Sequence, residues 1–194
     1  SLIGSVGAAT NTLELYGAGS GQTDFNGRLS PVAPGGGRLV ARSATGVFLQ
    51  EVNGSLAVLE AIATAGPVRL SVADSALEGE RFTMHSTGVR LTGELVTRGT
   101  VSATGGLVNI EAADELLLPA DTTVTSTVSV RLAVDVAVPD NDPGFGGTLT
   151  VRGAVDAPTV TLQGGANVDF IELLTPLGIN RLGSTVLAGG GGDD

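Results

Sequence analysis

Hydrophobic residues alternate with polar residues in short runs that recur along most of the chain, and the first members of successive runs are about 20 residues apart. Alternation at positions i and i+2 is typical of a β-strand that buries one face. A strand that returns at such an interval predicts one coil of a parallel β-helix. We therefore expect an all-β fold of the β-solenoid class. The runs are Val47/Leu49, Val68/Leu70/Val72, Val89/Leu91, Val108/Ile110, Val128/Val130/Leu132, Leu149/Val151 and Ile171/Leu173.

Secondary apolar positions between these runs predict further strands on other faces of each coil, separated by turns such as Asn53-Gly54 and Gly146-Gly147. The segment 55–65 has a helix-permissive composition, yet we interpret it as a strand and a turn. An antiparallel sandwich also has short strands with frequent turns. The narrow spacing of the runs and the scarcity of aromatic residues favour the solenoid.

The composition is that of a chain of small residues, with 30 glycines, 3% aromatic residues and no cysteine or tryptophan among 194 residues. Residues 1–194 are expected to form a single solenoid module. Neither end shows a cap, and a terminal coil without a cap exposes strand edges. We therefore expect one segment of a longer tandem array whose partners are neighbouring copies or flanking modules. Joining Asp194 to Ser1 would complete a glycine-rich motif with Leu2 in its apolar position.

The net charge is −10, and all ten basic residues are arginines. Such a surface lacks the basic patch and stacking aromatics that nucleic acids require, so nucleic acid is excluded as a partner. Scattered carboxylates favour divalent cations instead. The longest apolar stretches fall short of the roughly 20 residues that span a bilayer, so no membrane insertion is expected.

The strongest local motif is the run of four glycines and two aspartates at 189–194. It matches the first six positions of the calcium-binding nonapeptide Gly-Gly-x-Gly-x-Asp-x-apolar-x of the repeats-in-toxin family. A degenerate copy at 164–171 has Asn167 at the fourth position, and the two copies are close to one coil apart, so their turns are expected to stack. A third acidic cluster follows Pro139. We expect Ca²⁺ as a cofactor, and the candidate ligand positions are Gly189, Gly190, Gly192, Asp194, Gly164, Gly165, Asp169, Asp140 and Asp142.

Catalytic constellations are weak in this sequence. His85 is the only histidine, and no nucleophile elbow accompanies it. Carboxylates such as Asp135 and Asp156 would suit a polysaccharide-cleaving β-helix, but no groove of aromatic residues is evident. The chain is therefore expected not to be an enzyme. A carbohydrate-binding or carbohydrate-cleaving β-helix, with cell-surface glycans as partners, is the alternative.

Two stretches carry a resemblance to a known family. Residues 45–58, followed by 65–72, and residues 139–153, followed by 157–165, resemble repeats of giant bacterial surface proteins. These proteins combine filamentous-haemagglutinin-like β-helices with haemolysin-type calcium-binding repeats. The resemblance covers residues 39–194. It implies a secreted, extracellular or cell-surface structural module that serves as a filament or adhesin and that calcium stiffens.

Overall fold

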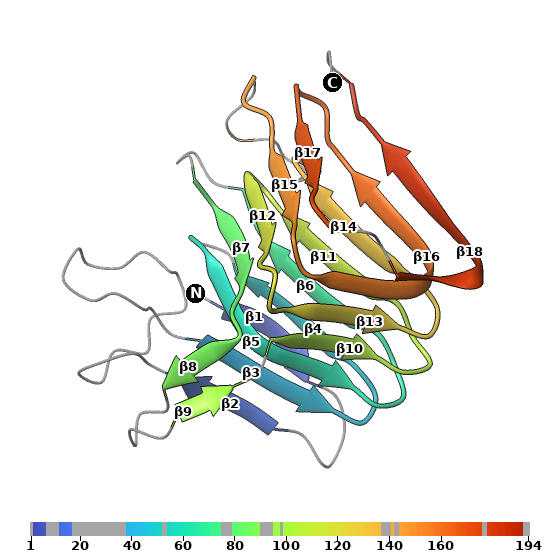
Figure 1. Ribbon diagram of the computed structural model, residues 1–194. Coiled ribbons are helices and arrows are strands. Elements are labelled where there is room, and N and C mark those ends of the chain that lie inside the picture. The colour runs from blue at the N-terminus through green and yellow to red at the C-terminus, as the bar shows by residue number, and fades with distance from the viewer. Residues whose placement is uncertain are drawn as a thin grey trace.

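The computed structural model describes residues 2–6, 12–16, 38–51, 54–74, 79–89, 95–97, 99–136, 141, 144–175 and 178–191. Within these ranges all of the regular secondary structure is β-strand, so the all-β class is confirmed. Sixteen strands form one large sheet that does not close on itself, and two strands form a separate hairpin. Figure 1 shows the strands stacked in sequence order from the N-terminal to the C-terminal end.

The strands are short, and most span three to six residues. They are β1 Leu2–Val6, β2 Thr12–Tyr16, β3 Arg38–Ser43, β4 Val47–Glu51, β5 Leu56–Ala63, β6 Val68–Val72, β7 Arg81–Met84, β8 Thr87–Val89, β9 Leu95–Thr97, β10 Thr100–Ala103, β11 Val108–Ala112, β12 Glu115–Leu118, β13 Thr123–Ser126, β14 Val130–Val134, β15 Thr148–Val151, β16 Ala154–Gln163, β17 Phe170–Leu173 and β18 Gly178–Ala188. Strand β5 occupies the segment for which a helix was the rival interpretation, so that prediction is confirmed.

The sheet is built from three ladders of parallel strands. Ladder A contains β4, β6, β11, β14 and the second parts of β16 and β18. Ladder B contains β3, β10, β13, the second part of β5 and the first parts of β16 and β18. Ladder C contains the first part of β5 with β7, β12, β15 and β17. From β3 onward the main sheet repeats the order B, A, C along the chain. Repeated parallel pairing of this kind is incompatible with an antiparallel sandwich.

The main hydrophobic core lies between the ladders and is filled by alternate residues of most strands. In β11, Val108, Ile110 and Ala112 are buried, whereas Asn109 and Glu111 are partly exposed. Equivalent inward residues of neighbouring strands stack in columns, because in-register parallel strands repeat about every 4.8 Å. The thin interior accepts small aliphatic side chains, and Phe82 is its one large aromatic residue among those described.

The uniform spacing predicted from the sequence is wrong in part. Val47, Val68, Val108 and Val130 do pair in register in ladder A, but the step from Val68 to Val108 is nearly twice as long as the other two. The runs that begin at 149 and 171 lie in ladder C. Val89 falls in the antiparallel hairpin β8–β9, outside the main sheet, and its predicted partner Leu91 lies outside the described residues. The alternation of apolar and polar residues indicates that one face of a strand is buried, but it does not indicate to which ladder the strand belongs.

The two ends of the stack differ. At the N-terminal end β1 pairs with β4 and β2 pairs with β3, both in antiparallel register. These two strands cover the first strands of ladders A and B, although the sequence shows no cap there. At the other end β17 and β18 are the last strands of ladders C, B and A (Figure 1).

Candidate functional site

Acidic residues gather where the chain turns from ladder A to ladder C. We call this set the acidic corner; it contains Asp74, Glu80, Asp114, Asp135 and Asp169. Each of the ladder A strands β6, β11 and β14 is followed within two residues by one of these aspartates. Because the ladders are in register, the turns lie one above another.

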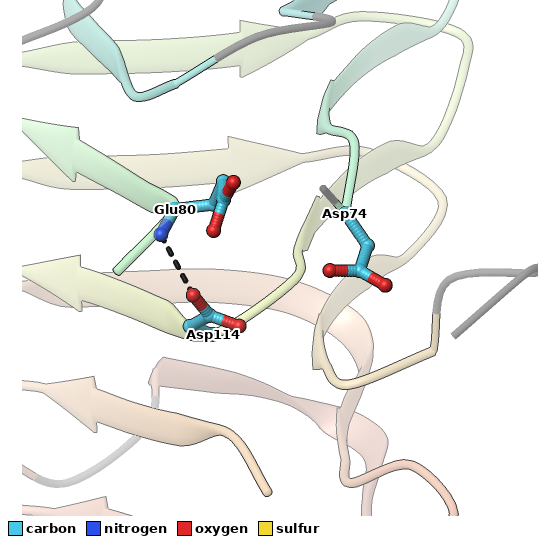
Figure 2. Close-up of side chains that lie close together, drawn as sticks. All are labelled: Asp74, Glu80 and Asp114. Carbon is cyan, nitrogen blue, oxygen red and sulfur yellow. Dashed lines mark hydrogen bonds between the residues drawn. The ribbon is translucent and has the colours of Figure 1, made fainter. Parts of the chain in front are cut away.

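Three members of the acidic corner converge. Ligand oxygens of Asp74, Glu80 and Asp114 all lie within 4.8 Å of one another (Figure 2). Glu80 is only 3% exposed, and the two aspartates are half-buried. Asn141 holds Asp74 from outside, since its backbone N–H donates to the carboxylate and its side-chain amide donates to the backbone carbonyl at 3.1 Å. Asp74 Oδ1 is shielded from solvent and accepts no hydrogen bond within the described part of the chain.

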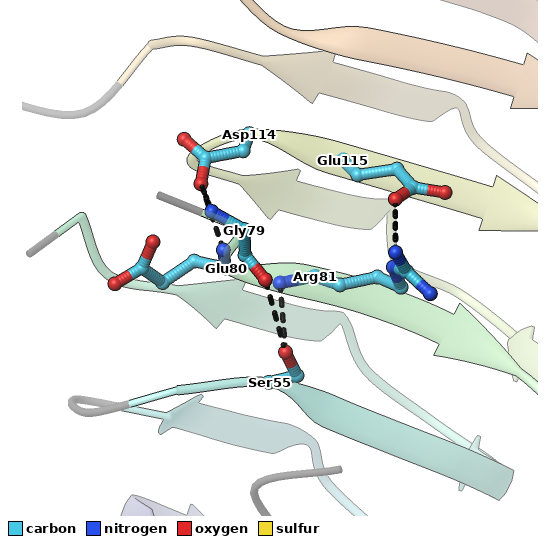
Figure 3. A network of polar contacts seen from close by, with 6 residues as sticks. All are labelled: Ser55, Gly79, Glu80, Arg81, Asp114 and Glu115. Atoms are coloured by element: carbon cyan, nitrogen blue, oxygen red, sulfur yellow. Dashed lines mark hydrogen bonds and ion pairs between the residues drawn. The ribbon is translucent and has the colours of Figure 1, made fainter. Parts of the chain in front are cut away.

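A hydrogen-bond network fixes the backbone that carries Glu80 (Figure 3). Asp114 Oδ2 accepts from the backbone N–H of Gly79 and from that of Glu80, the latter at 2.7 Å. Ser55 Oγ accepts from the backbone N–H of Arg81 at 3.0 Å. The turn before β7 is therefore tied to the preceding and following levels of ladder C.

The guanidinium group of Arg81 points away from the three carboxylates. Its guanidinium pairs with Glu115 at 2.7 Å, on the outer face of ladder C (Figure 3). Three carboxylates this close repel one another unless a proton or a cation lies between them. Hard oxygen ligands of this type are those that Ca²⁺ prefers. The triad has the chemistry of a divalent-cation site.

The degenerate glycine motif lies in the same corner, further along the stack. Asp169 is 8% exposed, and its carboxylate accepts the backbone N–H groups of Gly147, at 2.6 Å, and of Gly165. The Asp169 side chain thereby fixes the turn before β17. A Cβ added at Gly164 would lie 2.2 Å from Asp169 Oδ2, so glycine there lets the carboxylate approach.

The two glycine motifs lie on consecutive levels, as their spacing predicted. The Gly191 N–H donates to the Gly165 carbonyl at 2.9 Å, and the Gly164 N–H donates to the Ala188 carbonyl at 2.8 Å. A Cβ at Gly190 would lie 1.0 Å from the Gly165 carbonyl oxygen. Close stacking of backbones is thus a sufficient reason for glycine at Gly165 and Gly190. Gly189 lies at the start of the second turn.

Four predicted ligands lie outside the described residues: Gly192, Asp194, Asp140 and Asp142. Asn141, between two of them, is described and contacts Asp74. None of the predicted ligands belongs to the triad of Asp74, Glu80 and Asp114, which the sequence interpretation missed. A usable signal exists, because Asp74 and Asp114 each stand two residues after a β-strand of ladder A and each follows an alanine.

Comparison with known proteins finds no family model, no curated protein and no solved structure that matches this chain significantly. The resemblance to haemagglutinin-like and repeats-in-toxin proteins therefore has no support from these comparisons. Over the residues that the structure describes, no helix has the length and apolar character to cross a membrane.

Proposed function

We propose that this chain is a structural β-solenoid, a parallel β-helix whose regular coils have about 20 residues, from a larger secreted bacterial surface protein. The three ladders, visited in a fixed order, support this architecture. The steps from Val47 to Val68 and from Val108 to Val130 each correspond to one such coil and support its length. The longer steps accommodate the β8–β9 hairpin and the segment between β14 and β15.

The observation that carries the structural role is the exposed core at the C-terminal end. Leu49, Leu70, Ile110, Leu132 and Leu162 form one buried column of ladder A, and Leu187 continues it. Leu187 is 67% exposed, although its side chain occupies the inward position. In ladder C, Leu173 continues the column of Val151 and is 41% exposed. A further level of strands would bury both side chains and pair the open edge.

The partner that fits this end is another β-solenoid level, either a flanking module or a second copy. Strands of such a level would add to β17 and β18, and its aliphatic side chains would cover Leu187 and Leu173. In this role the chain is a spacer or stalk of a filament or adhesin and catalyses no reaction. The cysteine-free, acidic composition suits the extracellular or cell-surface location that we propose.

Calcium is the cation that we propose for the acidic corner. The triad of Asp74, Glu80 and Asp114 supports this, since it joins turns on successive levels of the stack. A cation between those levels would stiffen the solenoid along its axis.

The structural role is tested by measuring molar mass against protein concentration with light scattering. We expect the mass to rise above that of one chain as the concentration increases, because the open end becomes covered. A chain that stays monomeric at the highest soluble concentration would contradict association through this end.

A further inference from the structure

The outward face of ladder A carries a groove of about 400 Å³ that is distinct from both the acidic corner and the open end. Four strands, β6, β11, β14 and β16, contribute to it. The polar residues that line it are Arg69, Asn109, Ser129, Arg131, Thr159 and Thr161.

The arrangement of these residues follows from the register. Arg69 pairs with Asn109, Asn109 with Arg131, and Arg131 with Thr161. Since neighbouring strands lie about 4.8 Å apart, the two arginines are about 10 Å apart at their backbones, with Asn109 between them. Phe48 extends the same row beyond Arg69 and is 37% exposed.

Arg131 is held in place before any ligand arrives. Its Nε donates to Gln163 Oε1 at 2.9 Å, and its Nη1 donates to Asn109 Oδ1 at 2.9 Å and to Glu111 Oε1. Glu111 is fixed in turn by the Asn109 amide at 2.9 Å. These contacts leave the Nη2 group of Arg131 without a hydrogen bond to any described residue. A donor fixed by its neighbours binds an anion at a smaller entropic cost.

Arg69 is the second cation of the groove. Its side chain is exposed and makes no hydrogen bond or ion pair with the described residues. Glu111 is the one carboxylate that contacts these groove residues within the described part of the chain, so it offsets one of the two guanidinium charges. The groove therefore has a local excess of one positive charge on a chain whose net charge is −10.

We propose that this groove binds a sugar acid of an acidic polysaccharide. The carboxylate of one uronate unit lies over Asn109, where the guanidinium of Arg69 binds it bidentately and the Nη2 group of Arg131 donates a further hydrogen bond. The hydroxyl groups of Ser129, Thr159 and Thr161 donate to and accept from the sugar hydroxyls, because hydroxyl side chains do both. A single excess charge suits one carboxylate per unit and not a polyphosphate, which requires many cations.

The test is a titration of isotope-labelled protein with a galacturonic acid trimer, followed by amide chemical shifts. We expect saturable shifts at the groove residues and none with a neutral galactose trimer. Arg69→Gln should weaken binding about tenfold or more, the effect of losing a charged hydrogen bond. Because Arg69 is exposed and has no partner among the described residues, the variant should melt like the parent chain.

Arg152→Gln is the matched control, since Arg152 is exposed and lies 3.9 Å from Glu172, outside the groove. It should bind the trimer as the parent does, and an equal loss in both variants would mean that only overall charge matters. Absence of saturable shifts would overturn the site. A tri-aspartate peptide or sulfate that binds as tightly as the trimer would overturn the assignment to a sugar acid.

Discussion

Leu162 and Leu187 are register partners in ladder A, yet Leu162 is fully buried and Leu187 is 67% exposed. Both side chains take the inward position of their strands. The difference arises because β16 has a strand on each side, whereas β18 has one side open. Phe170 and Leu174, at 61% and 53% exposure, add to the apolar surface at this end. Exposed apolar residues of this kind are typical of a surface that associates, in line with the association that we propose.

Replacing Leu187 with aspartate should suppress self-association. A charge at this inward position of the open end would have to be buried without a partner, which costs several kcal/mol. We expect the concentration at which molar mass doubles to rise about tenfold or more in light scattering. Val128→Asp is the control, because Val128 is 49% exposed but lies in the turn before β14, two strands away from the open edge of β18. An equal effect of both variants would speak against the open end as the contact.

Calcium should stabilise the fold if the acidic corner binds it. Saturation at about 100 times the dissociation constant adds about 2.7 kcal/mol. For a domain of this size, that raises Tm by roughly 5 to 10 °C. A chelator should reverse the increase, as measured by calorimetry.

Asp74→Asn should abolish most of this calcium response, since it removes one charge from the triad. Asp156→Asn should leave the response intact, because Asp156 is an exposed residue of ladder B outside the acidic corner. A Tm that does not change across millimolar Ca²⁺ in the parent chain would remove calcium from the proposed function.

Stability should fall as the pH falls from about 6.5 to 4, in part because of His85. The pKa of His85 is lowered to about 4, chiefly by burial and also by repulsion from Arg38, while Asp121 opposes the change. The unfolded chain, with a histidine pKa of about 6.5, binds the proton more readily, so protonation favours unfolding in this window.

The contribution of His85 should be about 1 to 2 kcal/mol, because the ring is only partly buried and solvent screens it. Below pH 4 its contribution no longer changes. His85→Gln should flatten this part of the denaturant-derived stability profile relative to the parent chain. Parallel profiles for the two proteins between pH 6.5 and 4 would show that another group is responsible.

Gly165→Ala should destabilise the C-terminal levels by about 1 to 3 kcal/mol, the usual cost of overpacking. A Cβ there would lie 1.5 Å from the Asp135 carbonyl oxygen, and neither backbone can yield without breaking the register. Gly191→Ala should have a smaller effect on stability, since its Cβ would lie 3.1 Å from the Ala166 carbonyl oxygen. Thermal unfolding of both variants tests the difference, and equal melting temperatures would contradict the stacking explanation.

The sequence predicted the strands well because alternation at i and i+2 follows directly from the pleat. The first two inward residues of each of the strands β4, β6, β11 and β14 were found in this way, whereas Ala112 and Val134 at the ends of β11 and β14 were not. The ladder assignment of Leu149 and Ile171 was not found, because a strand of ladder C has the same alternation as a strand of ladder A. The β8–β9 hairpin was not predicted, because Val89 falls at the interval of about 20 residues that is expected for a strand of the main sheet.

The candidate site was harder to predict from the sequence. Asp74 and Asp114 are far apart along the chain, and only the register of β6 with β11 brings them together. The glycine-rich turns were predicted as calcium sites because their motif is contiguous in the sequence. In the structure the described glycines Gly165 and Gly190 allow close backbone stacking. A calcium-binding motif and an ordinary solenoid turn can therefore have the same glycine-rich composition.

The antiparallel strands β1 and β2 limit how identical copies can assemble. Among the described residues the parallel order of the ladders ends at β4 and β3, so a second copy that meets β1 and β2 does not continue this parallel pairing. Two copies would therefore meet through their C-terminal ends about a twofold axis, and such an isologous contact closes at two subunits. Free copies of this segment should give a symmetric dimer and no fibre, and a longer rod would require the levels to be linked in one polypeptide.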